Sequence, residues 1–209
     1  SILNEAITNS IQANATEIEI YFYTLAIDLF GDIKKVKNIS IIDNGDGFTD
    51  KNIDSFNHYM SEYKQALGCK GIGRFTYLTI CEKVEFESYN NNKNIKFNFN
   101  LETEEIKPTV IENETLVKKT KLKYINIENR EVSSDLSVEA KEIINHFLSI
   151  FKFMVDENKN VLIKLYIDDV LKESIEAKEH GSNFIDEKFT IKVRDIEETF
   201  KVSYKQKGS

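Results

Sequence analysis

A chain of 209 residues, 41% of them hydrophobic, is long enough to bury a core, which excludes a chain that is disordered throughout. Its 28 basic and 35 acidic side chains give a net charge of -7, which argues against a broad surface for nucleic acid. No apolar run approaches the roughly 20 residues that a membrane-spanning helix needs, and no signal-peptide pattern is present, so we expect a soluble protein.

The chain opens on a stretch whose apolar residues recur at helical spacing. Those residues are Leu3, Ile7 and Ile11, and the polar residues Glu5, Asn9 and Gln12 fall on the opposite side at i, i+4 and i+7. The spacing predicts one helix with an apolar face for the core and a compact polar face. A helix face of this composition is usually just solvated, so by itself it identifies no site.

From residue 16 the period changes to two. Alternating apolar residues predict a half-buried strand, namely Ile18, Ile20 and Phe22. A turn around Gly31 separates this strand from a second one at residues 36–43. The second strand ends on Asp43 and runs directly into the sequence Asn-Gly-Asp-Gly.

The rest of the chain alternates helical and strand-like patterns. Residues 51–66 have an irregular helical pattern, and a further helix is expected to start within 71–80. The clearest amphipathic helix follows at 137–155. Strands are expected at 83–89, 94–101, 119–127, 161–168, 188–193 and 199–204. This order favours an α+β fold, a two-layer sandwich with a mixed, mainly antiparallel sheet and helices on one face.

Three groups of residues carry the chemical signal: the polar face of the first helix, the sequence DNGDG at 43–47 and the glycine-rich segment GCKGIG at 68–73. Glycines after a strand let the backbone approach a ligand or adopt positive φ, but an ordinary turn has the same needs. Free N–H groups at a helix start bind anions, and Lys70 lies among them. Each group alone is weak evidence, so the weight rests on the order and spacing of all three.

Together the three groups resemble the motifs of the GHKL ATPase family, which includes DNA gyrase, the heat-shock chaperone of the ninety-kilodalton class, sensor histidine kinases and MutL. The family's E-x-x-x-N, D-x-G-x-G and G-x-x-G-x-G motifs are similar to residues 5–9, 43–47 and 68–73. Thr120 resembles the threonine of the fourth family element, although Lys119 stands where a glycine usually precedes it. The basic residues around the glycine-rich segment look more like the chaperone, MutL and MORC-type branches than the kinase branch.

The resemblance implies a Bergerat fold that encloses ATP, and Mg²⁺-dependent ATP hydrolysis. In these roles Asp43 accepts a hydrogen bond from the adenine amine, a buried polar pair that discriminates strongly against ligands lacking the amine. Gly45 and Gly47 leave room for the base and the ribose. Asn9 offers Mg²⁺ a carbonyl oxygen. Glu5, one helical turn earlier, orients and deprotonates the attacking water.

The remaining nucleotide contacts are also implied by the resemblance. The glycine-rich segment would cradle the β- and γ-phosphates through backbone N–H groups and one lysine, namely Gly68, Lys70, Gly71 and Gly73. Gln12 and Thr120 complete the nucleotide-binding set. Family members often carry Asp at the position of Gln12, so a role that needs charge is weakened here.

By the same resemblance, residues 1–157 form the nucleotide-binding domain, and residues 158–209 begin a β-rich, transducer-like element. Family members carry residues ahead of the catalytic helix, so we expect an N-terminally truncated domain with slow turnover. We expect a nucleotide-dependent homodimer in the full-length protein, which binds a protein client or nucleic acid through further domains and has no membrane partner.

One alternative from another class stays open. It is a nucleotide-sensing interaction module that binds ATP or ADP and switches partners without significant turnover. The two cysteines, Cys69 and Cys81, lack the number and spacing for a disulfide framework or a zinc site, so a cytoplasmic location is expected.

Overall fold

A computed structural model describes residues 2–27, 33–57, 77–90, 93–112, 117–127, 160–176, 185–193 and 196–204. Several expectations lie outside these ranges. They are the turn around Gly31, the second half of the irregular helix at 51–66, the helix start at 71–76, the helix at 137–155 and the glycine-rich segment at 68–73.

The first helix and the first two strands form as the periodicities predict. Helix α1 (Ile2–Gln12) buries Leu3 and Ile7 completely, which at roughly 1.5–3 kcal/mol per side chain stabilises its docking. The helix ends because Asn14 adopts φ 61°, and the Ala15 N–H donates back to the Ser10 carbonyl at 3.0 Å. The chain then enters β1 (Glu17–Ile27).

Asn44 holds the connection between α1 and β1 in place. It follows β2 (Ile33–Asp43), and its Oδ1 accepts the N–H groups of Thr16 and Glu17 at 2.9 and 3.0 Å. The end of β2 is therefore tied to the start of β1.

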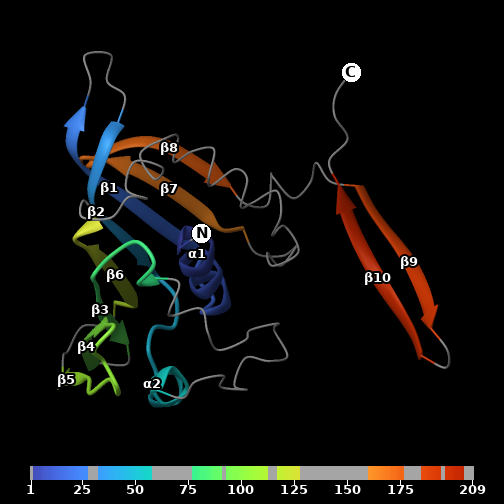
Figure 1. Ribbon diagram of the computed structural model, residues 1–209, viewed down its shortest axis with the longest axis horizontal. Coiled ribbons are helices and arrows are strands. Elements are labelled where there is room, and N and C mark those ends of the chain that lie inside the picture. The colour runs from blue at the N-terminus through green and yellow to red at the C-terminus, as the bar shows by residue number, and fades with distance from the viewer. Residues whose placement is uncertain are drawn as a thin grey trace.

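Eight strands form the main sheet in the order β5-β4-β3-β6-β2-β1-β7-β8 (Figure 1). The strands not yet bounded are β3 (Lys83–Asn90), β4 (Lys93–Asn100), β5 (Thr109–Glu112), β6 (Lys119–Ile125), β7 (Leu162–Ile167) and β8 (Val170–Glu176). Strands β1 and β7 run parallel, and the other neighbouring pairs of this sheet run antiparallel. The expected mixed, mainly antiparallel sheet is confirmed.

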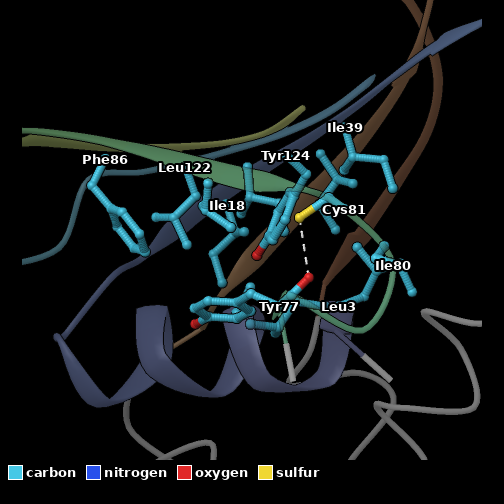
Figure 2. Close-up of a cluster of buried hydrophobic side chains, with 14 of the residues drawn as sticks. Leu3, Ile18, Ile39, Tyr77, Ile80, Cys81, Phe86, Leu122 and Tyr124 are labelled. Atoms are coloured by element: carbon cyan, nitrogen blue, oxygen red, sulfur yellow. Dashed lines mark hydrogen bonds between the residues drawn. The ribbon is translucent and has the colours of Figure 1, made fainter. Parts of the chain in front are cut away.

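Both described helices cover the same face of the sheet. Thr49 caps the N-terminus of helix α2 (Asp50–Asn57), because its Oγ1 accepts the Asn52 N–H at 3.2 Å. Phe56 of α2 packs edge-on against Phe86 of β3, at a centroid distance of 5.6 Å. Phe86 also contacts Tyr77, which in turn hydrogen-bonds to α1. The core therefore lies between the two helices and one sheet face, as the part around α1 shows in Figure 2.

The second half of the chain differs in part from the expectation. Strands β5 and β8 were not predicted, and β7 and β8 extend the main sheet beyond β1. The domain boundary at residues 157 and 158 stays a prediction. Strands β9 (Ile185–Val193) and β10 (Ile196–Tyr204) pair with each other in a separate antiparallel sheet.

Within the described ranges, none of the helices has the length and apolar character that crossing a membrane requires. Cys81 is fully buried, and its S–H donates to the Tyr77 carbonyl at 3.1 Å. Its thiol therefore contributes to packing beneath the sheet.

Candidate functional site

The polar face of α1 is built around Asn9. Its Nδ2 donates to Glu5 Oε1 at 3.1 Å and to the Tyr77 hydroxyl at 2.9 Å. Glu5 and Asn9 are half-buried, whereas the Tyr77 side chain is buried. The predicted helical spacing thus brings Glu5 and Asn9 into direct contact, and a third residue, far away in the sequence, joins them.

Asp43 ends β2 as a buried carboxylate, 6% exposed. Its Oδ2 accepts the Ser10 hydroxyl at 2.8 Å, and its Oδ1 accepts the Gly45 N–H at 2.9 Å. Burial raises the pKa of the Asp43 carboxyl above its ordinary value, and the two hydrogen bonds from Gly45 and Ser10 oppose that rise. Each carboxylate oxygen keeps acceptor capacity for a further donor.

Gly45 allows the loop after β2 to lie against the end of α1. A Cβ at this position would stand 2.7 Å from the Ala13 carbonyl oxygen, which is too close for any side chain. The Asp46 N–H donates to that same oxygen at 2.7 Å. The loop and the helix are therefore in backbone contact, and this contact sets the position of Asp43 relative to α1.

Gly47 is required for a different reason. It has φ +71°, and a Cβ there would meet Ser88 Oγ at 2.3 Å. Ser88 Oγ accepts the Phe48 N–H at 3.0 Å and lies 3.3 Å from Thr120 Oγ1. Ser88 therefore fastens the loop to β3 and contacts the predicted threonine of the site.

A row of buried polar residues crosses the helix-covered face of the sheet. Ser88 on β3 stands opposite Thr120 on β6, and Thr120 stands opposite Asp43 on β2. Their exposed fractions are 1%, 5% and 6%. Burying three adjacent polar side chains on an otherwise apolar face costs desolvation free energy. Packing of the core does not require polar residues at these positions.

The predicted site residues fall into three groups. Those that the structure brings together through direct contacts or adjacent register are Glu5, Asn9, Asp43, Gly45, Gly47 and Thr120. Gln12 is the last residue of α1 and half-buried. The predicted phosphate-binding residues lie outside the described residues, namely Gly68, Lys70, Gly71 and Gly73.

Sequence reasoning missed Ser10, Ser88 and Tyr77. Ser88 carried a detectable signal, because it occupies an inward position in the alternation of Val84 and Phe86 along β3. Ser10 and Tyr77 carried none, since their partners are 33 and 68 residues away. Burial, and next the charge of Glu5, raises the pKa of the Tyr77 phenol, so its hydroxyl stays protonated at neutral pH.

The arrangement has the chemistry to read a hydrogen-bond donor and to hold a cation. Asp43 keeps acceptor capacity on both carboxylate oxygens, which suits a ligand that bears an amine. The Asn9 carbonyl oxygen is a hard ligand of the kind that Mg²⁺ prefers. No group of three or more His, Cys, Asp or Glu side chains that suits a metal occurs among the described residues. A cation here would have to take further ligands from a bound anion or from water.

Comparisons with known proteins give a family and a fold. Residues 1–143 match the family described as histidine kinase-, DNA gyrase B-, and HSP90-like ATPase. No curated protein matches the chain. Among solved structures, the N-terminal domain of a DNA repair protein is 17% identical with a TM-score of 0.55, and the match covers 98% of this chain and 66% of that one.

Two further solved structures have the same architecture. The MutL ATPase domain of Aquifex aeolicus complexed with ADP is 13% identical with a TM-score of 0.51, and the match covers 91% of this chain and 70% of that one. The 43K ATPase domain of Thermus thermophilus gyrase B in complex with an aminocoumarin is 14% identical with a TM-score of 0.53, and the match covers 87% of this chain and 46% of that one. At these identities the likeness shows the fold, and the chain spans less than two thirds of the first and third structures.

Proposed function

We propose that this chain, which belongs to the histidine kinase-, DNA gyrase B- and HSP90-like ATPase family, binds an adenine nucleotide at Asp43 and hydrolyses ATP. The observation that carries the proposal is the buried polar row of Ser88, Thr120 and Asp43, beside a loop that two glycines bring close. The ADP bound to the MutL ATPase domain supports the class of ligand.

Asp43 reads the base in this proposal. The Ser10 hydroxyl and the Gly45 N–H hold both carboxylate oxygens in place, so the carboxylate is oriented before a ligand arrives. The exocyclic amine of adenine donates a further hydrogen bond to the Asp43 carboxylate. Guanine presents a carbonyl at the corresponding position, and two acceptors facing each other repel. Asp43 thus provides selectivity for adenine, with Thr120 and Gln12 as further contacts.

Glu5 and Asn9 perform the chemistry at the other end of the nucleotide. Asn9 would offer its carbonyl oxygen to Mg²⁺, and the bound ion would neutralise phosphate charge. Glu5 orients a water molecule and takes its proton as the water oxygen bonds to the γ-phosphorus, while the bond from that phosphorus to the β–γ bridging oxygen breaks and ADP leaves. The glycine-rich segment binds the phosphates through backbone N–H groups and Lys70.

The proposed partners and location of the protein also rest on its membership of this ATPase family. We infer that nucleotide binding in the full-length protein drives dimerisation, as a conformational switch of the chaperone, MutL or MORC-like type. A protein client or nucleic acid would then bind through other domains. A cytoplasmic location fits the use of two isolated cysteines.

Phosphate release by this chain tests hydrolysis directly. Glu5→Gln keeps an oxygen that accepts from Asn9 but removes the base, so we expect kcat to fall by about 10²- to 10⁴-fold while affinity for a non-hydrolysable ATP analogue stays within about twofold. Equal hydrolysis by wild type and variant would contradict the role of Glu5. ATP binding without measurable release by wild type would favour the nucleotide-sensing module.

A further inference from the structure

Asn9 has a side-chain amide whose orientation the structure assigns. Its Nδ2 carries two hydrogens, and two acceptors receive them, Glu5 Oε1 at 3.1 Å and the Tyr77 hydroxyl oxygen at 2.9 Å. Rotating the amide by half a turn would place the Asn9 carbonyl oxygen against the Glu5 carboxylate, where two acceptors repel. The carbonyl oxygen of Asn9 is therefore directed away from both partners.

Tyr77 is the rigid member of this pair of partners. Glu5 is half-buried on the same helix, one turn from Asn9, and its carboxylate must be free to rearrange if it takes a proton. Tyr77 is only 3% exposed, with its ring against Tyr124 and Phe86 at centroid distances of 5.6 and 6.2 Å. Figure 2 shows its ring between α1 and the strands. Packing therefore holds the hydroxyl in one place.

We propose that Tyr77 is a positioning residue for the nucleotide reaction, and that its hydroxyl helps to hold the Asn9 amide in the orientation that leaves the carbonyl oxygen available to Mg²⁺. The inference rests on the proposed function and deepens it. Tyr77 acts through Asn9 and does not touch the nucleotide. Without the hydroxyl, one N–H of the Asn9 amide loses its acceptor, and the carboxylate of Glu5 alone holds the amide, so its position is less firmly fixed.

The chain offers a matched control in Tyr124. This residue of β6 is fully buried, and Figure 2 shows its side chain pointing from the sheet towards Tyr77. Within the described part of the chain, its hydroxyl has no hydrogen-bond partner. Tyr77→Phe and Tyr124→Phe therefore each remove one buried phenolic oxygen from the same aromatic cluster, but only Tyr77→Phe removes an anchor of Asn9.

The first readout needs no nucleotide. The side-chain NH₂ signals of Asn9 are assigned by their loss in Asn9→Asp, and their hydrogen exchange is then compared in wild type and the two Phe variants. We expect exchange in Tyr77→Phe to be about fivefold faster, because one of the two hydrogen bonds is gone. Tyr124→Phe should leave these signals unchanged. Identical Asn9 signals in all three proteins would overturn the proposal.

The second readout separates positioning from general stability. Calorimetric titration measures binding of a non-hydrolysable ATP analogue as Mg²⁺ is varied, and binding of ADP without Mg²⁺. For Tyr77→Phe we expect the apparent Mg²⁺ affinity to fall about five- to tenfold, and Mg²⁺-free ADP affinity to stay within about twofold. Tyr124→Phe should match wild type in both, and thermal melting checks that both variants fold.

The two proposals fail in distinguishable ways. If wild type binds the analogue with Mg²⁺ but Tyr77→Phe behaves like Tyr124→Phe, the role of Tyr77 is wrong and the proposed function stands. If Tyr77→Phe weakens Mg²⁺-free ADP binding as strongly as Mg²⁺-dependent binding, its effect is on the whole pocket and the positioning role is wrong. If wild type binds neither ligand, the proposed function is wrong, and the role of Tyr77 falls with it.

Discussion

Asp43 is a residue that destabilises the folded protein when no ligand is bound. Its carboxylate is buried, and none of the described residues gives it a cationic partner in direct contact. The hydrogen bonds from Ser10 and Gly45 offset only part of its desolvation. Such a group is typical of a binding site, where a ligand completes its hydrogen bonds.

The raised pKa of Asp43 predicts how stability depends on pH. Between the ordinary value of 3.8 and the higher folded value, the folded protein binds the proton more tightly, so the free energy of unfolding falls as pH rises through that window. Above it, ionised Asp43 destabilises the fold. We therefore expect Asp43→Asn to melt at a higher temperature than wild type at pH 7, with a difference that shrinks as pH is lowered towards 4.

Thermal melting of both proteins without nucleotide at several pH values measures this difference directly. The comparison cancels the other carboxyl groups, which the two proteins share. A variant that melts below wild type at pH 7, by an amount independent of pH, would show that the Asp43 carboxylate stabilises the fold.

Gly47 and Ser88 are expected to be coupled. A Cβ at Gly47 would displace Ser88 Oγ, which stands 2.3 Å away, and a side chain is strained at φ +71°. Gly47→Ala should therefore lower the free energy of unfolding by about 1–3 kcal/mol in urea denaturation. In the double variant with Ser88→Ala the clash is gone but the strain remains, so the combined loss should be smaller than the sum of the single losses by at least about 0.5 kcal/mol. Strict additivity would mean that the two residues do not share this contact.

At the residue scale, the sequence predicted positions better than contacts. The spacing of Glu5 and Asn9 on one helix turn and the place of Asp43 at a strand end depend on local periodicity, and the structure places all three as expected. The contacts of Asp43 with Ser10 and of Asn9 with Tyr77 depend on how distant segments pack. A single sequence holds no record of that packing, so these two anchors became visible only in the structure.

At the scale of elements, alternating and helical patterns identified the parts that bury one face. Strands β1, β3 and β6 were predicted because apolar residues repeat every second position along them. Strand β5 is exposed along its whole length, and β8 buries mainly Ile175, so neither has such a pattern. Both lie at the edges of the sheet, where one neighbour is missing and burial is least.

The pairing of β7 with β1 makes a prediction about where the domain ends. In the described range 160–176, four buried side chains contribute to the core, namely Val161, Ile163, Leu165 and Ile175. At roughly 1.5 kcal/mol or more each, their loss would remove about 6 kcal/mol, comparable with the whole stability of a small domain. A chain that ends at residue 157 should therefore be unfolded or aggregated. A chain that ends at 184 keeps β7 and β8 and should melt cooperatively.

Circular dichroism and size-exclusion chromatography of the two shortened chains decide this point. If the chain ending at 157 melts as cooperatively and at the same temperature as the chain ending at 184, then β7 and β8 are dispensable and the boundary expected at 157 is supported.

For the molecule as a whole, the family and the fold agree. The expected α+β sandwich of the Bergerat type is confirmed by its likeness to the MutL and gyrase B ATPase domains, and the match to the ATPase family covers residues 1–143. The net charge of -7 gives no support for nucleic-acid contact by this part of the protein.

The central claim is that Asp43 reads the adenine of a bound nucleotide, and a thermal shift measurement tests it most directly. Wild type and Asp43→Asn are melted with ADP, with a non-hydrolysable ATP analogue and with GDP, each with Mg²⁺. At about 100-fold over Kd, a ligand of the folded state adds about 2.7 kcal/mol, or roughly 5–10 °C for a chain of this size. We predict this shift in wild type with both adenine nucleotides, little shift with GDP, and none in Asp43→Asn. Equal shifts in wild type and variant, equal shifts with ADP and GDP, or no shift of wild type with any nucleotide would contradict the claim.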